Sequence, residues 1–271
     1  MLRNQLVVAG LALSAMSAPV VAQQSSDTSQ VQKTFFTRRD AAWSGVALAA
    51  SAGVSIFDVR ISNWFQTPSV QGTSSRHDVF KSLTVVNEQP LALAAVATYG
   101  IGKLTGSATV ADVGLHATEA LVLTVGVSEA IRGPLGRLRP RVSQNDQYDF
   151  KFWRGFTDFA GRSYPSLHAA VGFATASVLV GEMRERHASA TPYLAPVLYA
   201  AAMVPGITRL YLDEHWASDV VAGAFVGTLL GSRVVHYAHT HKRNKLDRFL
   251  LGTTLVPDGH GGVLVMKTFG N

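Results

Sequence analysis

The chain has 271 residues, of which 47 % are hydrophobic and only 15 % are charged. Soluble proteins average about 25 % charged residues, so this composition excludes a disordered chain and favours a helical protein in or against a membrane. The formal net charge is +6, and nine of the 24 basic residues lie between Arg132 and Arg186, which suits an anionic partner. The chain has no cysteine, which excludes disulfides, thiolate zinc sites and cysteine nucleophiles.

The first 22 residues have the pattern of a secretory signal peptide. Arg3 supplies the positive start, residues 6–16 are apolar, and small residues precede a cleavage site after Ala22. The alternative is an uncleaved first membrane anchor. Residues 23–40 follow as a polar leader. We therefore expect an exported protein whose folded domain covers residues 41–245.

Apolar stretches rich in Ala, Gly and Val recur through that domain, and none keeps the alternation of a strand over its length. They predict an all-α fold, a bundle of about six core helices with a seventh, amphipathic piece around residues 76–88. The six predicted core helices cover residues 41–57, 90–105, 111–131, 167–182, 194–207 and 216–237. Only 111–131 and 216–237 reach the roughly 20 residues of a membrane span. A membrane-embedded or membrane-associated bundle is the preferred interpretation, and a soluble exported bundle is the alternative.

The last residues, 246–271, have a different composition. Residues 249–256 and 263–269 predict two short strands around a turn rich in Gly and Pro. We expect a C-terminal tail with a short β-hairpin and no catalytic role.

A first cluster of candidate functional residues follows the predicted helix at 111–131. Its sequence, Arg132-Gly-Pro-Leu-Gly-Arg137-Leu-Arg139-Pro140-Arg141, predicts a stiff basic loop in which Arg137 is accessible. Guanidinium groups bind phosphate oxygens bidentately and stay charged. A positive loop that flanks a membrane would have the same composition.

Two further clusters lie at predicted helix starts. Ser166 is placed to cap the helix at 167–182, where free N–H groups attract anions, and His168 falls in its first turn. His215 and Asp219 are four residues apart and share one helical face. A carboxylate fixes the tautomer of an imidazole and leaves its other nitrogen free to attack. The alternatives are a structural His–Asp pair, or a metal pair with Glu214 nearby.

Taken together and in order, these clusters resemble the motifs of the type 2 phosphatidic acid phosphatase superfamily, which includes bacterial class A acid phosphatases and vanadium haloperoxidases. The matching segments are Arg132-x6-Arg139-Pro140, Pro165-Ser166-Leu167-His168 and Thr208-Arg209-x5-His215-x3-Asp219. The chain departs from the family pattern by Arg132 for Lys, Leu167 for Gly and Thr208 for Ser. Leu167 is the departure of most concern, because a side chain there could narrow the pocket.

The resemblance implies a phosphatase that works through a phosphohistidine, without a metal or other cofactor. His215 is then the nucleophile, Asp219 orients it, and His168 is the general acid and base. The phosphoryl oxygens are then bound by Arg132, Arg139, Arg209, Ser166 and the backbone N–H of Leu167.

The expected substrate is a lipid phosphate monoester or diphosphate of the phosphatidate, phosphatidylglycerol phosphate or undecaprenyl diphosphate type. We expect a membrane partner, an active site that faces the periplasm, no nucleic acid and no obligate protein partner. The alternatives are a soluble periplasmic acid phosphatase of broad specificity, a vanadium haloperoxidase, and a non-catalytic membrane protein.

Overall fold

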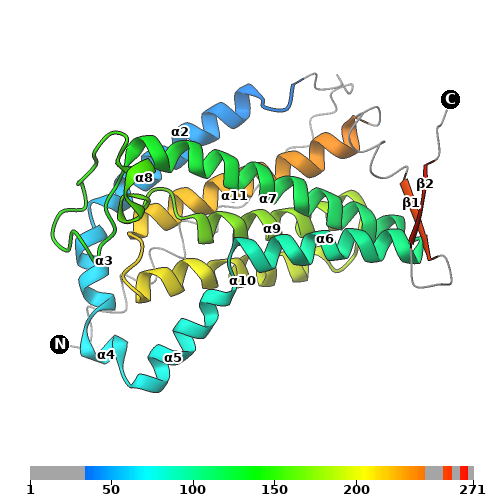
Figure 1. Cartoon of the computed structure of the whole chain (residues 1–271). Helices are drawn as coiled ribbons and strands as arrows, with labels where there is room; N and C mark the ends of the chain where they lie inside the picture. Colours follow the sequence, from blue (N-terminus) through cyan, green and yellow to red (C-terminus); the bar gives the residue numbers. More distant parts are fainter. Residues whose placement is uncertain (1–33, 242–252, 258–262, 268–271) are drawn as a thin grey trace. The chain divides into compact units, whose positions relative to one another are not determined.

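The computed structural model describes residues 34–241, 253–257 and 263–267, and the predicted signal peptide lies outside these residues. The described part is predominantly helical (Figure 1), which confirms the predicted fold class. In chain order its helices of eight or more residues are α2 (Arg38–Ser55), α3 (Asp58–Phe65), α5 (Ser74–Ser82), α6 (Glu88–Thr105), α7 (Ala108–Leu135), α9 (Leu167–Glu185), α10 (Thr191–Tyr211) and α11 (Ala217–Thr240).

Shorter elements connect these helices. The single-turn helix α4 (Pro68–Gln71) joins α3 to α5, the 3₁₀ turn η1 (Leu83–Val85) follows α5, and α8 (Arg154–Thr157) with η2 (Phe159–Gly161) lies between α7 and α9. Strands β1 (Thr253–Pro257) and β2 (Val263–Lys267) pair antiparallel, as the predicted hairpin requires. The residues of its turn lie outside the described part.

Each of the six predicted core helices is present, and the helices extend beyond most of the expected bounds. Prolines are tolerated inside two of these helices, and one of them, Pro134, lies in an extension. Pro134 lies inside α7, which therefore includes Arg132, and Pro196 and Pro205 lie inside the 21-residue α10. The expected amphipathic helix at 76–88 is shorter, since α5 ends at Ser82. The expected leader ends early, because Thr37 caps α2.

Helix α9 is at the centre of the packing and contacts α7, α10 and α11 (Figure 1). Its residues Ala169, Ala170, Val171 and Ala174 are fully buried. Gly227 of α11 lies directly against the carbonyl oxygen of Ala170, where a Cβ would overlap that oxygen. Small residues allow two helix backbones to approach closely. The Ala and Gly residues of the sequence therefore allow the close packing of α9 against α11.

Three helices, α7, α10 and α11, are long and apolar enough to cross a membrane. The pair α2 and α3, bent by 60°, could form a fourth span. Large apolar side chains are exposed on α2, α6 and α10, including Leu48, Leu93 and Val197. Extended exposed apolar surface marks an interaction with a membrane or a partner, and together with the long helices it indicates membrane association.

Candidate active site

The candidate active site lies where four helices meet: the C-terminal ends of α7 and α10 and the N-terminal ends of α9 and α11. Backbone hydrogen bonds join the three sequence clusters there. The N–H of Ser166 donates to the carbonyl of Asp219 at 2.9 Å, and the N–H of Arg141 donates to the carbonyl of Asp213 at 3.1 Å. Segments far apart in the sequence are therefore held in one fixed arrangement.

His215 and Asp219 lie together as predicted, but they do not share a helical face, because His215 lies in the connection before α11. The Nδ1 atom of His215 lies 3.6 Å from Oδ2 of Asp219, and the two residues are 2 % and 0 % exposed. The same Oδ2 accepts hydrogen bonds from the Trp216 N–H at 2.8 Å and the Ser163 hydroxyl at 2.5 Å. Asp219 thus caps the start of α11 and faces the imidazole at the same time.

Arg137 has a different place from the one expected. It is only 2 % exposed, so the prediction of an accessible Arg137 is wrong. Its guanidinium donates to Oδ1 of Asp219 at 2.5 Å and to Oδ2 of Asp58 at 2.8 Å. A planar guanidinium can pair with two carboxylates at once, so Arg137 is the cation shared by both of these buried acids. Sequence reasoning missed this role, although a carboxylate such as Asp58 beside an apolar stretch is a signal for a buried cation.

Ser166 and His168 lie at the start of α9. Ser166 is its N-cap and accepts from the N–H of Ala169, as predicted. The ring of His168 lies 6.3 Å from that of His215 between centroids. The side chain of Leu167 belongs to a buried core cluster that includes Leu121 and Val171. It therefore packs into the core and does not narrow the space between the two histidines.

Three arginines surround these histidines. Arg209 contacts Nε2 of His168. Arg139 is paired with Glu214 and lies over the ring of Phe159, 4.3 Å from its centroid. Arg132 lies in the last turn of α7, not in a loop as predicted, and its Nε donates to the carbonyl of Arg162 at 3.0 Å.

Burial and the arginine charges determine the protonation of the site. Burial lowers the pKa of His215 to about 4, although Asp219 acts in the opposite direction. Burial lowers the pKa of His168 to about 2, and the charge of Arg209 adds to this effect. Burial also lowers the pKa of Arg139. Both imidazoles are therefore neutral near pH 7. The electron pair on Nε2 of His168 then accepts from Arg209.

This arrangement defines the class of the protein. Two neutral imidazoles, a carboxylate behind one of them, three arginines and a helix N-terminus make a site for an oxyanion at the end of a helical bundle. Residues 114–243 match the family model of the PAP2 superfamily. This match includes all three motifs and confirms the resemblance of the chain to that superfamily.

Curated relatives match parts of the chain. It is 34 % identical over 111 residues to a lipid A 1-phosphatase of Porphyromonas gingivalis, covering 41 % of this chain and 20 % of the relative. It is 31 % identical over 149 residues to a lipid A 4'-phosphatase of Bacteroides thetaiotaomicron, covering 53 % of this chain and 61 % of the relative. The chain therefore spans less than two thirds of either relative.

A solved structure is also similar, at a lower level. It is the crystal structure of the first transmembrane PAP2 type phosphatidylglycerolphosphate phosphatase from Bacillus subtilis. The identity is 16 %, the match covers 72 % of this chain and 98 % of that one, and the TM-score is 0.34.

Proposed function

We propose that the protein hydrolyses a phosphate ester of a lipid through a phosphohistidine on His215. The observation that carries this proposal is the convergence of His215 and His168 with Arg132, Arg139 and Arg209 at one end of the bundle. Because Nδ1 of His215 faces Asp219, Nε2 is the nitrogen left to attack phosphorus. Asp219 orients the ring and stabilises the positive charge that the ring gains.

In the first step the bond between His215 Nε2 and phosphorus forms while the bond from phosphorus to the ester oxygen breaks. His168 gives its proton to that oxygen, so the alcohol leaves neutral. In the second step His168 takes a proton from water, the water oxygen attacks phosphorus, and the N–P bond breaks. The arginines, with the Ser166 hydroxyl and the backbone N–H of Leu167, hold the phosphoryl oxygens throughout.

A lipid substrate is favoured by the surface next to the site. The connection between α7 and α9 exposes large aromatic side chains, among them Phe152 at 76 % and Phe159 at 63 %. Aromatic rings of this kind concentrate at the interface between membrane and water. The ring of Phe159 lies beneath Arg139, so one segment offers both an apolar surface and a phosphate-binding group. We place this end of the bundle at the periplasmic surface of a membrane.

The substrate is best tested with a panel of phosphate-release assays. It includes phosphatidate, phosphatidylglycerol phosphate, undecaprenyl diphosphate, lipid A and soluble p-nitrophenyl phosphate. Lipid A is added because two relatives are named as lipid A phosphatases. Preference for a lipid over the soluble ester, in kcat/KM, supports the proposal. Preference for the soluble ester would favour the broad-specificity acid phosphatase.

The mechanism is tested with variants of the same enzyme. His215→Ala should lose about 10⁴-fold or more in kcat, as the loss of a nucleophile does elsewhere, and Asp219→Asn should leave a small remainder. His77→Ala, a change of an exposed histidine in α5, is the matched control and should leave kcat unchanged. Rapid quenching with ³²P-labelled substrate should trap an acid-labile, base-stable phosphoenzyme in the wild type only. A reversible loss of initial rate in EDTA, on enzyme that stays folded, would contradict this mechanism.

A further inference from the structure

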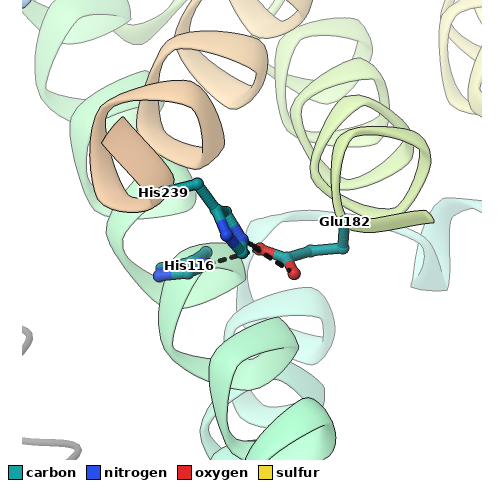
Figure 2. Close-up of side chains that lie close together, drawn as sticks. All are labelled: His116, Glu182 and His239. Atoms are coloured by element: carbon teal, nitrogen blue, oxygen red, sulfur yellow. Dashed lines mark hydrogen bonds and ion pairs between the residues drawn. The ribbon is translucent and has the colours of Figure 1, made fainter. Parts of the chain in front are cut away.

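A second cluster of ionisable side chains lies inside the bundle, away from the candidate active site. His116 of α7, Glu182 of α9 and His239 of α11 point toward one another (Figure 2), and one ligand atom from each lies within 4.8 Å of the others. His116 and Glu182 are 3 % and 2 % exposed, whereas His239 is 25 % exposed. Two imidazoles and one carboxylate thus lie together, and solvent has access to them on the side of the partly exposed His239.

The two oxygens of the Glu182 carboxylate have different surroundings. Oε1 lies 2.5 Å from Nδ1 of His116 and 3.1 Å from Nε2 of His239. Oε2 lies 3.2 Å from the same Nε2 of His239 and 2.6 Å from Nη1 of Arg186, whose Nη2 donates to Asp112 at 2.7 Å. Both oxygens therefore face His239, while Oε1 also faces His116 and Oε2 is held by Arg186. Outer partners of this kind orient the ligands of metal sites.

The helices place this cluster at the opposite end of the bundle from the candidate active site. Along α9, His168 and Glu182 are 14 residues apart, or about 21 Å at 1.5 Å per residue. Along α7, His116 and Arg132 are about 24 Å apart, and along α11, Asp219 and His239 are about 30 Å apart, by the same rise. The three helices that carry the cluster are thus three of the four whose other ends meet at the site.

We propose that His116, Glu182 and His239 form a binding site for a divalent metal ion of the zinc type, which clamps α7, α9 and α11 together. Imidazole nitrogen and carboxylate oxygen are the donors that Zn²⁺ and Co²⁺ accept, and three protein ligands leave a further position to water. The ion serves stability and not the chemistry, because it lies at the far end of the helices. This site stands whether or not the proposed phosphatase activity holds. It also differs from the expectation of no metal that the sequence motifs gave.

The test is the uptake of cobalt and zinc by the full chain, purified in detergent without a histidine tag. After dialysis against CoCl₂ and removal of free metal, we expect one cobalt per chain and visible d–d absorption bands of a site with nitrogen and oxygen ligands. At a zinc concentration about 100 times Kd, the Tm should rise by about 5–10 °C. A wild type that takes up neither metal would overturn the proposal and leave a hydrogen-bonded triad.

Variants locate the ion. His239→Ala removes one ligand, and Glu182→Gln keeps the shape of the side chain but removes its charge. Each should weaken metal binding by more than about tenfold, since even outer partners of metal ligands have effects of that size. His77→Ala and His168→Ala should keep the cobalt bands. Bands that persist in both His239→Ala and Glu182→Gln, or that disappear in His168→Ala, would place the ion elsewhere and overturn the proposal.

Discussion

At the scale of single residues, the two histidines of the candidate site face opposite requirements. A nucleophile must be neutral, and the pKa of about 4 to which burial brings His215 satisfies this at all physiological pH values. A general acid must carry a proton, which the pKa of about 2 of the buried His168 opposes in the free protein. A bound phosphate dianion would favour the charged form of His168 and raise its pKa. The proton of the general acid is therefore expected to arrive together with the substrate.

Proton uptake on anion binding tests this expectation. The relevant pH range lies between the pKa of His168 in the free protein and its higher pKa in the complex. In this range the affinity for a dianion should fall by up to about tenfold for each unit by which the pH rises. Tungstate at micromolar concentration is a suitable probe, because its own charge is constant near neutral pH. Calorimetry in buffers of different ionisation enthalpy should show that the wild type takes up a proton when tungstate binds. The His168→Ala variant should bind tungstate without this proton uptake. Binding without proton uptake in the wild type would contradict the assignment of His168 as the general acid.

Arg137 makes a second prediction at this scale. Replacing it with Met leaves Asp58 and Asp219 buried without their shared cation, which should destabilise the protein by about 3–5 kcal/mol. The Tm measured by circular dichroism in detergent should fall accordingly. Adding Asp58→Asn to Arg137→Met removes one uncompensated charge and should recover part of the loss. A Tm for Arg137→Met equal to that of the wild type would show that the network has no part in stability.

At the scale of elements, the apolar Ala-, Gly- and Val-rich stretches were enough to predict every core helix. Their bounds were less predictable: the helix expected to end at residue 131 continues through Pro134 to Leu135. The motif spacing predicted the pair of His215 and Asp219, although His215 lies in the connection before α11 and only Asp219 lies in the helix. It could not predict the burial of Arg137, because Asp58 is 79 residues away in the sequence and meets it only in the folded chain. The separation of His116 from Glu182 by 66 residues concealed that cluster in the same way.

The close packing of α9 and α11 gives a prediction at this scale. Gly227→Val would force a side chain against the carbonyl of Ala170 and separate the two helices, lowering both Tm and activity. Overpacking of this kind costs about 1–3 kcal/mol or more. The matched control is Gly126→Ala in α7, where a Cβ meets nothing within 4 Å. That change should keep or raise the Tm, because alanine favours a helix by about 0.5–1 kcal/mol over glycine. Equal effects of the two changes would contradict the proposed closeness of α9 and α11.

At the scale of the whole molecule, the helices that are long enough to cross a membrane carry the candidate site at one of their ends. The site is formed at the C-terminal end of α7 and beside the N-terminal end of α11, both of which are candidate spans. A substrate anchored in the membrane by its acyl chains would present its phosphate at this level. If the site lies at the periplasmic face, the α7–α9 connection must face the periplasm and the α9–α10 connection must face the cytoplasm.

Single cysteines introduced at the two ends test this orientation, and labelling is clean because the native chain contains no cysteine. Arg137 is unsuitable since it is buried, whereas Asn145 in the α7–α9 connection and Ser189 in the α9–α10 connection are both exposed. A maleimide that does not cross the inner membrane should label Asn145→Cys in cells whose outer membrane has been permeabilised. Ser189→Cys should react only after the inner membrane is opened as well. The reverse pattern would put the site on the cytoplasmic side. Equal labelling of both, together with recovery of the protein in a salt-washed soluble fraction, would show a soluble protein and leave the assignment of His215, His168 and Asp219 unchanged.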